Sequence, residues 1–551
     1  MMNLEKRSPS ILTGAFVGGL LTLPLMAVTY LGFVVAGLPF APYDALFPFI
    51  RNRTPGGIIT LTIDSIIAII QFLNLGRTDT AAKPIEQIMA LLMLVGVGVV
   101  IGAVVFAIAR RIKAGDRYLP GFLVGAALGL LMVIFYTDSG IPATTSPTIS
   151  NLWLFGSFLA FALGINWIYN DLSDLPVHAP TGETTASVQP IDRRQFLVRV
   201  GGATATLTVL GAGLGALLTP RGTTRTTTSS ATAALLPEVT PEGTPVAGTT
   251  AGLEPAPGTR LEYTPLDEHY RIDISARPPV LDASTWRLRV SGLVESPVEM
   301  TLDSLMNDYE PVDQIITLSC ISNPVAGDLI STTRWTGVQL NLLLEEWNLL
   351  PEATHLRITS ADGFDEYVAL ETIRNDDRIL LAYAWDGQPL KQKHGFPLRI
   401  YIPNHYGMKQ PKWITDIEVV DEWQEGYWVR RGWSEAALVQ TTSVIDTVAT
   451  DAVYERDGQM VVPIGGIAYA GSRGISSVEV QIDDGEWQQA DLRSPLSELT
   501  WVIWRYDWAF TEGGHTFRVR CVDGLGGPQT ETVQGVRPDG ATGIHQTIAR
   551  T

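Results

Sequence analysis

Five long apolar stretches fill most of the first 218 residues and constrain the fold more than any other feature of the sequence. They are Ile11–Leu38, Pro84–Ala109, Tyr118–Tyr136, Ile149–Tyr169 and Val200–Leu218. Each is close to or above the roughly 20 residues that an α-helix needs to cross a bilayer. A sixth stretch, Gly57–Leu75, holds Asp64. It is either a span with a functional intramembrane carboxylate or, as we favour, an interfacial or re-entrant helix. The sequence predicts an α-helical region over residues 1–218, with five or six spans in contact with membrane lipid.

The charges between the spans predict their orientation. Arg110, Arg111, Lys113 and Arg117 form the strongest basic cluster between spans, which places this loop in the cytoplasm. The loop Thr137–Thr148 has no Lys or Arg and should lie outside. Five spans with the N-terminus inside satisfy both conditions, as do six with the N-terminus outside. We therefore expect a multi-pass protein of the cell membrane with residues 220–551 on the extracytoplasmic side.

Charge, cysteine and histidine usage exclude several classes of protein. Residues 1–200 are nearly balanced in charge, so almost all of the net charge of −18 lies in the remainder, which argues against nucleic-acid binding. The two cysteines, Cys320 and Cys521, allow at most one disulfide, although Cys521 also fits the core of a half-buried strand. No histidine lies in a span and no Cys-x-x-Cys-His occurs, so no haem is expected in this chain. If electrons arrive or leave, a separate electron-transfer partner must carry them.

The part that follows the spans divides into three segments. Residues 219–260 are rich in Thr, Pro, Ala and Gly and predict a flexible linker. Residues 261–444 have a globular pattern, in which Trp286, Leu288 and Val290 alternate with arginines as in a half-buried strand. From residue 445 to 551 the pattern is all-β, with short strands at the spacing of an immunoglobulin-like sandwich.

Two groups of motifs carry the chemistry. In the first, the β-branched run Gln314–Ser319 leads to Cys320 and then to the turn Ser322-Asn323-Pro324, so the cysteine lies where a strand ends. Arg334-Trp335-Thr336-Gly337-Val338 follows, and Asp386-Gly387 signals a hairpin. The second group is His394-Gly395-Phe396-Pro397-Leu398-Arg399 with Lys412-Trp413. Together these motifs resemble the sulfite oxidase family, and the resemblance covers nearly all of residues 261–551.

This resemblance implies a fold, a cofactor and a set of site residues. The fold is an α+β, mainly β, molybdopterin domain followed by an immunoglobulin-like domain through which the chain could form a homodimer. The catalytic cysteine and metal ligand is Cys320, whose thiolate would bind the molybdenum of a pyranopterin cofactor, because soft sulfur suits this metal. The other implied contacts are with the pterin or its phosphate, through Tyr270, Arg271, Ser360, His394, Arg399, Gln410, Pro411 and Lys412.

The last span is preceded by Asp192–Val198, with the sequence DRRQFLV, which resembles a twin-arginine export motif. That route exports folded proteins, so a cofactor could be inserted before export. The alternative is an ordinary positive-inside anchor. In both cases no clean cleavage site follows, and we expect the helix to remain as an anchor.

The substrate is less constrained than the cofactor. Sulfite oxidases bind their anion with arginines near the metal, but here Pro324-Val325-Ala326 and Ile272 or Asp273 occupy those positions. The function implied is two-electron oxygen-atom transfer to or from sulfite, a sulfoxide or another small oxyanion or oxo compound. The alternative is a non-catalytic, membrane-tethered binding or structural protein that kept the fold.

Overall fold

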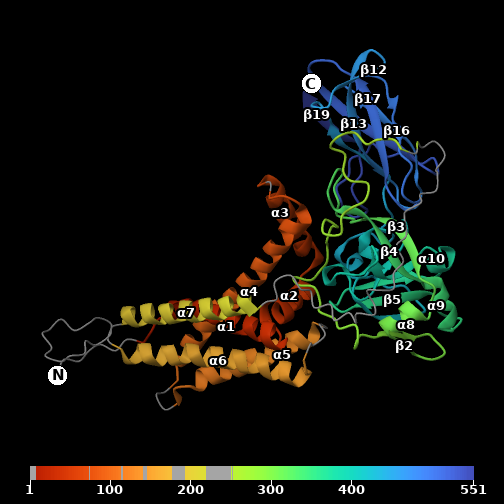
Figure 1. Ribbon diagram of the computed structural model, residues 1–551. Coiled ribbons are helices and arrows are strands. Elements are labelled where there is room, and N and C mark those ends of the chain that lie inside the picture. Colours follow the sequence, from red (N-terminus) through yellow and green to blue (C-terminus); the bar gives the residue numbers. More distant parts are fainter. Residues whose placement is uncertain are drawn as a thin grey trace, which may run out of the picture. The chain divides into compact units, whose positions relative to one another are not determined.

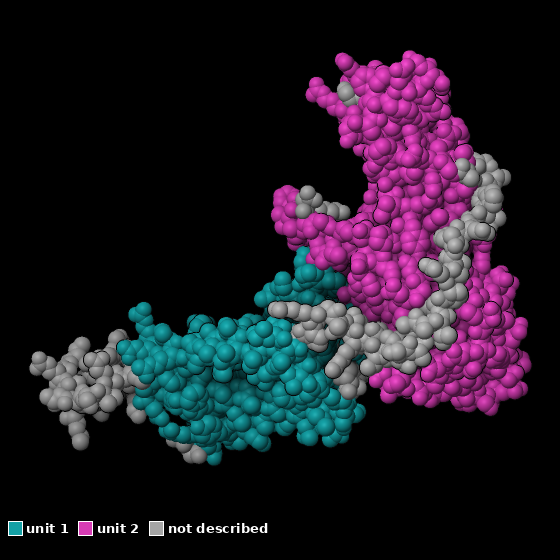
Figure 2. Space-filling view, viewed as in Figure 1, with its two compact units in different colours: residues 1–54, 82–226, 275–280 teal, residues 55–81, 227–274, 281–551 magenta. Residues whose placement is uncertain are grey.

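The structure is a computed structural model that describes residues 8–73, 75–112, 116–139, 145–175, 193–218, 250 and 252–550. Most of the predicted linker, residues 219–249, and Asp192 of the twin-arginine-like motif lie outside these residues. The chain forms two compact units, coloured separately in Figure 2. Unit 1 comprises residues 1–54, 82–226 and 275–280, and unit 2 comprises residues 55–81, 227–274 and 281–551.

Unit 1 is helical (Figure 1). Its elements are α1 (Ile11–Ala36), the π-helical turn η1 (Pro42–Leu46), α2 (Phe47–Arg53), α4 (Thr78–Ala109, entering from unit 2), α5 (Leu119–Asp138), α6 (Pro147–Asp174) and α7 (Arg193–Leu218). Among the described residues, α1, α4, α5, α6 and α7 are long and apolar enough to cross a membrane. The bent pair 42–53 and 56–70 would add a sixth crossing if it formed one span. The predicted apolar helices are thus confirmed, with α4 and α6 each extending several residues beyond the predicted stretch.

Small residues allow α1 and α4 to approach closely. A Cβ atom on Gly18 would lie 2.0 Å from the carbonyl oxygen of Gly98, and one on Gly102 would lie 2.0 Å from that of Gly14. Glycines at helix crossings let backbones touch where lipid supplies no hydrophobic driving force between helices.

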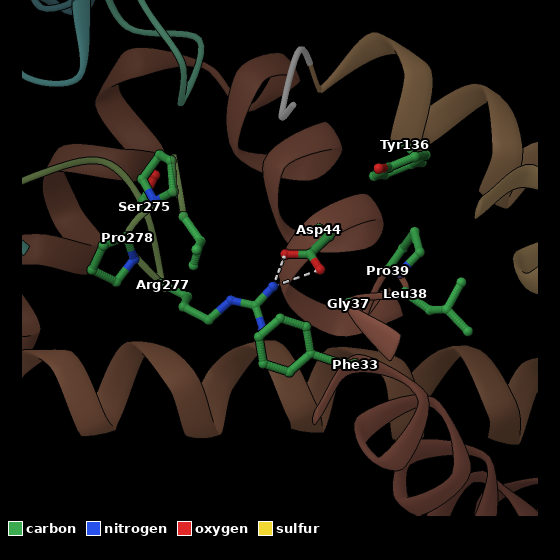
Figure 3. Close-up of a pocket in the computed structure, with 11 residues that line it drawn as sticks. Phe33, Gly37, Leu38, Pro39, Asp44, Tyr136, Ser275, Arg277 and Pro278 are labelled. Carbon is green, nitrogen blue, oxygen red and sulfur yellow. Dashed lines mark hydrogen bonds and ion pairs between the residues drawn. The ribbon is translucent and has the colours of Figure 1, made fainter. Parts of the chain in front are cut away.

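Residues 275–280 belong to the helical unit although they lie far away in the sequence. Arg277 donates to both carboxylate oxygens of Asp44 at 2.7 Å, and its guanidinium lies 3.6 Å from the centre of the Phe33 ring (Figure 3). Lys83 Nζ and Gln87 Nε2 donate to the carbonyls of Ser275 and Ala276 at 3.3 and 3.1 Å. The chain that leads into the β-rich part is therefore fastened to the helices.

Two sheets of unit 2 lie between residues 288 and 420. The first has the order β2-β1-β10-β5-β6, with β1 and β10 parallel. Its strands are β1 (Leu288–Gly292), β2 (Val298–Met300), β5 (His355–Ser360), β6 (Asp365–Ala369) and β10 (Ile414–Val420). The second has the order β3-β4-β7-β8, with β9 paired to β7. Its strands are β3 (Val312–Ser319), β4 (Ile330–Gln339), β7 (Leu380–Trp385), β8 (Gln388–Pro389) and β9 (Arg399–Tyr401).

Both sheets contribute to one hydrophobic core, which includes Leu288 and Ile358 from the first sheet and Leu381 and Ile400 from the second. Short helices lie between successive strands in the sequence: α8 (Leu302–Asn307), α9 (Leu340–Glu346), α10 (Leu370–Asn375), η4 (Gln392–His394), η5 (Gly407–Lys409) and η6 (Val429–Arg431). The hairpin predicted at Asp386-Gly387 joins β7 to β8, and both residues have the positive φ that a tight hairpin turn requires.

The C-terminal part of unit 2 contains two further antiparallel sheets. One holds β11 (Thr442–Val448), β12 (Tyr454–Arg456), β13 (Gln459–Tyr469), β16 (Asp491–Leu492) and β17 (Val502–Ala509). The other holds β14 (Ile475–Ile482), β15 (Gln488–Gln489), β18 (Gly514–Asp523) and β19 (His545–Arg550). Ile464 and Trp504 of the first sheet share a core with Val478 and Phe517 of the second.

The end of the predicted linker packs on this C-terminal part. Thr250 N–H donates to the carbonyl of Leu492 at 2.8 Å, and the Arg505 side chain donates to that of Glu254 at 3.0 Å. Ala256 is buried. Although residues 252–260 have the composition of a linker, Arg505 of β17 and Arg493, directly after β16, donate to the carbonyl groups of Glu254 and Leu253.

Candidate functional site

Cys320 directly follows β3, a strand buried over its second half. Its N–H donates to the carbonyl of Leu329 at 2.9 Å, which closes the loop 321–328 beside it. The thiol sulfur is 3.0 Å from Ser322 Oγ. Burial raises the pKa of the thiol, while the Ser322 hydrogen bonds and the charge of Lys412 act in the opposite direction. Cys320 and Cys521 are both free and buried, so the disulfide considered from the sequence does not form.

The side chains packed around Cys320 are mostly apolar. They form a small buried cluster of Tyr270, Leu318, Cys320 and Leu329, against which Ile272 packs. A Cβ atom on Gly407 would lie 3.0 Å from the Tyr270 hydroxyl and 3.6 Å from the carbonyl oxygen of Ser319. The glycine therefore leaves room between the phenol and the end of the cysteine strand.

Three predicted basic residues gather near this cysteine strand, and we call Arg271, Arg399 and Lys412 the cationic cluster. Asp273 Oδ2 accepts from both Arg271 Nε at 2.7 Å and Lys412 Nζ at 3.2 Å. Arg399 is buried, donates to the carbonyl of His394 at 3.1 Å and forms no ion pair within the described part of the chain. Burial lowers the pKa of Arg399 to about 10. Burial and the neighbouring Arg271 and Arg399 lower the pKa of Lys412 to about 8, although Asp273 opposes them.

Backbone geometry holds two of these cations side by side. Arg399 and Lys412 are paired in an antiparallel β-bridge. A Cβ atom on Gly395 would lie 3.1 Å from Arg399 Cβ and 3.3 Å from Lys412 Cβ, and the φ of this glycine is +115°. A side chain at position 395 would therefore be strained and would crowd both cations.

Beside the cations lies a group of four buried rings, His269, Trp335, Trp385 and His394, which we call the aromatic cluster. The rings of the two histidines are 5.3 Å apart, and the Trp385 ring is 4.7 Å from His394 and 5.4 Å from Trp335. The Arg399 guanidinium lies 4.6 Å from the Trp335 ring centre. Each ring places a buried nitrogen without a hydrogen-bond partner in this cluster, namely Nε2 of each histidine and Nε1 of each tryptophan.

The chemistry of these ring nitrogens is defined by their surroundings. His269 Nδ1 is 3.1 Å from the carbonyl of Tyr270, and because a carbonyl only accepts, Nδ1 carries the proton and Nε2 is an acceptor. Burial, followed by the charge of Arg399, lowers the pKa of His269 to about 3, and burial also lowers that of His394. Buried polar atoms without partners are rare and costly, so such a concentration fits a ligand that supplies donors and acceptors.

Three further predicted residues have different environments. Ser360 ends β5 opposite Ile414, and its buried hydroxyl has no hydrogen-bond partner, so it can bind a ligand. The N–H of Gln410 and the carbonyl of Pro411 bind Gly407 and Ile400 instead, at 3.1 and 3.2 Å. The side-chain nitrogen of Gln410 donates to the carbonyls of Ile402 and His405, which leaves only its buried Oε1 without a partner.

Sequence reasoning missed His269, Trp335 and Trp385 as site residues. His269 directly precedes Tyr270, which the sequence named as a cofactor contact, and this adjacency was the signal. Trp335 lies within a motif that carries the family resemblance and Trp385 directly precedes the predicted hairpin at Asp386-Gly387, but neither tryptophan was given a role. Their unpaired indole nitrogens become visible only when the rings are seen together, since a buried Trp N–H usually finds a partner.

The pocket drawn in Figure 3 is a separate feature of unit 1. Its lining includes Phe33, Asp44, Tyr136 and Arg277, and the two charged groups are already paired with each other. It therefore offers a ligand no unsatisfied charge.

The part of the chain that holds most of these residues is similar to known proteins. Residues 275–428 match the family described as the oxidoreductase molybdopterin binding domain. A nitrate reductase [NAD(P)H] of Hordeum vulgare is 29% identical in an alignment of 290 residues that covers 42% of this chain and 32% of that protein. The mitochondrial sulfite oxidase of Homo sapiens is 28% identical in an alignment of 287 residues that covers 44% of this chain and 52% of that protein. The chain thus spans about a third to a half of the length of these relatives.

Among solved structures, the sulfane dehydrogenase SoxCD from Paracoccus pantotrophus is similar, with a TM-score of 0.45 and 20% identity, covering 55% of this chain and 87% of that one. That likeness is too distant to bear on the site.

Residues 275–428 are therefore similar to molybdopterin-binding oxidoreductase domains. The predicted resemblance to the sulfite oxidase family and the predicted Mo-molybdopterin cofactor are confirmed. The residues of the structure fit this group, since a pterin ring offers partners to unpaired ring nitrogens and a phosphate matches buried cations.

Proposed function

We propose that this chain is a membrane-anchored oxidoreductase that transfers an oxygen atom, with two electrons, at a molybdenum bound by Cys320. One observation carries the proposal: the unpaired nitrogens of the aromatic cluster and the cationic cluster lie together near the strand that ends in Cys320. When bound, the cofactor supplies the redox centre and the site of oxygen transfer. The protein residues hold the cofactor and control access to it.

The role proposed for Cys320 is to bind the metal as a thiolate. Without the metal, burial keeps the thiol protonated because its pKa is raised. Metal binding therefore releases this proton, and the charge of Lys412 favours the thiolate. The position at the end of a buried strand fixes the sulfur in one direction.

The cationic cluster is proposed to bind the cofactor phosphate. Arg399 offers a planar fork for a bidentate contact and Lys412 a point charge, while Arg271 and Lys412 share Asp273. A bound anion would supply the negative charge that Arg399 lacks in the described chain. We assign the pterin ring to His269 and His394, with hydroxyl contacts from Tyr270 and Ser360 and weaker contacts from Gln410 and Pro411.

We propose a neutral oxo compound, such as a sulfoxide, as the substrate. The loop 321–329 beside the cysteine holds Asp328 as its one charged residue. Tyr270, Leu318 and Leu329 pack with Cys320, whose sulfur also contacts the Ser322 hydroxyl. With the cationic cluster assigned to the cofactor phosphate, a sulfite dianion would lack charge-assisted hydrogen bonds in these surroundings. Reduction of a sulfoxide consumes two electrons and two protons, and the oxygen leaves as water. A separate electron-transfer partner supplies the electrons.

The rest of the chain is assigned to anchoring and assembly. We infer that the five apolar helices span the cell membrane and that residues 261–444 lie on the extracytoplasmic side as a folded domain. The twin-arginine-like motif, whose residues 193–198 begin α7, would direct export after cofactor insertion. The two C-terminal sheets, residues 445–551, are proposed to be an immunoglobulin-like domain that forms a homodimer.

Metal analysis and a substrate screen test this function. The full chain is produced in a host that makes molybdopterin, purified in detergent, and analysed for molybdenum. We expect about one molybdenum per chain, reduction of sulfoxides with a reduced dye as electron donor, and little oxidation of sulfite. Protein without molybdenum from a competent host would instead favour the non-catalytic, membrane-tethered alternative. Sulfite oxidation faster than sulfoxide reduction would overturn the substrate assignment alone.

A further inference from the structure

Helix α3 (Gly56–Phe72) belongs to unit 2 with the β-sheets, although it lies between the first two candidate spans in the sequence. Arg537, in the segment before β19, donates to Asp64 Oδ1 at 3.0 Å and Oδ2 at 3.2 Å, and to the carbonyl of Thr60 at 3.3 Å. A Cβ atom on Gly56 would lie 2.9 Å from Arg431 Cα. The start of α3 therefore lies against Arg431, and the middle of α3 is bound to Arg537, both on the same side of the helix.

The opposite side of α3 is apolar and exposed. Ile58, Leu61, Ile69, Phe72 and Leu73 have exposed fractions of 56, 67, 49, 88 and 56%. Together with Ser65, the positions 58, 61, 69 and 72 recur every three or four residues, so they share one face of the helix, and Leu73 directly follows its end. A contiguous exposed apolar face of this kind marks an interaction surface.

The hydroxyl groups on this exposed face are satisfied within the helix. Thr62 Oγ1 donates to the carbonyl of Ile58 at 2.8 Å, and Ser65 Oγ donates to that of Leu61 at 2.7 Å. Asp64 is the only charged residue of α3, and it points to Arg537. A face without charges or unsatisfied donors suits lipid, where polar groups must find partners within the protein.

We propose that α3 lies along the membrane surface, with its apolar face in the outer part of the bilayer and its other side on unit 2. The proposal rests on the membrane anchoring proposed above. A helix whose middle is ion-paired to a β-domain cannot cross the hydrocarbon core, because the domain would enter the core with it. At 17 residues it is also about 25 Å long, shorter than the ~30 Å core.

This placement decides between the two topologies that the sequence leaves open. α3 and the β-domains lie on the same side of the membrane, so α1 and α4 are consecutive spans. Five spans then place the basic loop at Arg110 and Arg111 inside and the β-domains outside, as the charge rule requires. A sixth span at α3 would conflict with its ion pair to Arg537.

Residues 78 and 79, which follow α3 in the sequence, contact the loop beside the cysteine and the backbone of Arg271. Thr78 N–H donates to Asp328 Oδ2 at 3.1 Å, and the Arg271 N–H donates to Asp79 Oδ2 at 2.9 Å. Asp328 directly precedes Leu329, whose carbonyl binds the N–H of Cys320. The first residues of α4 therefore bind both the loop beside Cys320 and the backbone of Arg271.

Spin labels on single introduced cysteines test the placement in the full chain reconstituted in phospholipid nanodiscs. Ile58→Cys and Phe72→Cys report the outer face of α3. Leu130→Cys in α5 is the control for a spanning helix, and Leu525→Cys, 80% exposed in the C-terminal part, is the control for water. The native Cys320 and Cys521 are buried, and labelled wild type gives the background.

For each spin label, the rate of collision with oxygen, which enters lipid, is compared with the rate of collision with a water-soluble nickel chelate. For both α3 labels, we expect the ratio of oxygen collisions to nickel collisions to be severalfold higher than for Leu525→Cys. Both labels should lie at the same shallow depth in the bilayer, nearer its surface than the label of Leu130→Cys. Labels that behave like Leu525→Cys, or that are shielded from both reagents by protein, would overturn the proposal. So would depths differing by about 21 Å between positions 58 and 72, as in a spanning helix. A nickel-accessible Leu130→Cys would instead refute the membrane anchoring itself.

Discussion

Lys412 is paired with Arg399 of β9 in an isolated antiparallel β-bridge, which places a mostly buried lysine next to a buried arginine. Lys412 has Asp273 as its partner, whereas Arg399 forms no ion pair in the described chain. Burying a charge without a counterion destabilises the folded protein. The fold therefore tolerates Arg399 at a cost that a bound anion would offset.

Arg399→Met should have opposite effects on stability and on cofactor retention. Burial lowers the Arg399 pKa from 12.5 to about 10, which corresponds to a cost of about 3 kcal/mol for the charged form. Protein from a host without molybdopterin should therefore keep or gain unfolding free energy, by up to about 3 kcal/mol. Protein from a competent host should lose most of its molybdenum. Thermal unfolding and metal analysis measure the two effects.

Arg289→Met is the control for this substitution, since Arg289 is an exposed arginine paired with Asp416 on the strand surface. It should leave both stability and metal content near wild type. An Arg399→Met protein that retains full molybdenum would contradict the role assigned to the guanidinium.

Gly395→Ala should separate the two cations. The added methyl group meets Cβ atoms of Arg399 and Lys412 at 3.1 and 3.3 Å, and the φ of +115° is unfavourable for alanine. We expect a loss of more than about 1 kcal/mol in unfolding free energy together with loss of molybdenum. Gly432→Ala is the matched control, because Gly432 has a φ of +83° with nothing within 4 Å of the added atom. Gly432→Ala should lose the unfolding free energy that a positive φ costs an alanine, and it should keep its molybdenum.

The sequence predicted the parts of the structure that depend on local pattern. Leu288 and Val290 lie in β1 with their side chains buried, as their alternation predicted, although the strand begins only after the equally buried Trp286. Cys320 lies directly after its strand. The apolar stretches became helices because their hydropathy alone requires it. The basic members of the site were named because their motif resembles a family.

What the sequence could not predict depends on residues far apart in the chain. Asp64 binds Arg537 across 473 positions, and no periodicity relates the two. The unpaired nitrogens of His269 and Trp385 have meaning only when the rings meet at 5.5 Å. Each ring alone reads as a core residue.

Mild acid should destabilise the cofactor-free protein through His269. Burial and the charge of Arg399 lower its pKa from 6.5 to about 3, so the folded state keeps this ring neutral while the unfolded chain protonates it. Above pH 6.5 the ring has no effect. As pH falls from 6.5 towards 3, stability is lost progressively, by about 2 kcal/mol at pH 5. Denaturant unfolding at pH 7 and pH 5 measures the difference, and His269→Gln should reduce it by about that amount. An unchanged difference would show that His269 is not the group responsible.

Cys320→Ser tests the metal ligand itself. A serine hydroxyl keeps the volume of the thiol approximately but cannot supply the soft anionic sulfur, so molybdenum and activity should be lost. The loss of activity should exceed the roughly 10–100-fold effect of removing an outer-shell partner of a metal. Because the sulfur contacts Ser322 Oγ at 3.0 Å, the hydroxyl of the introduced serine can keep this hydrogen bond, and the fold should remain near wild type.

Cys521→Ser is the matched control, since Cys521 is equally a buried free cysteine but lies in the core of the C-terminal sheets. It should change stability and leave molybdenum bound. Turnover by Cys320→Ser with molybdenum retained would show that another residue holds the metal.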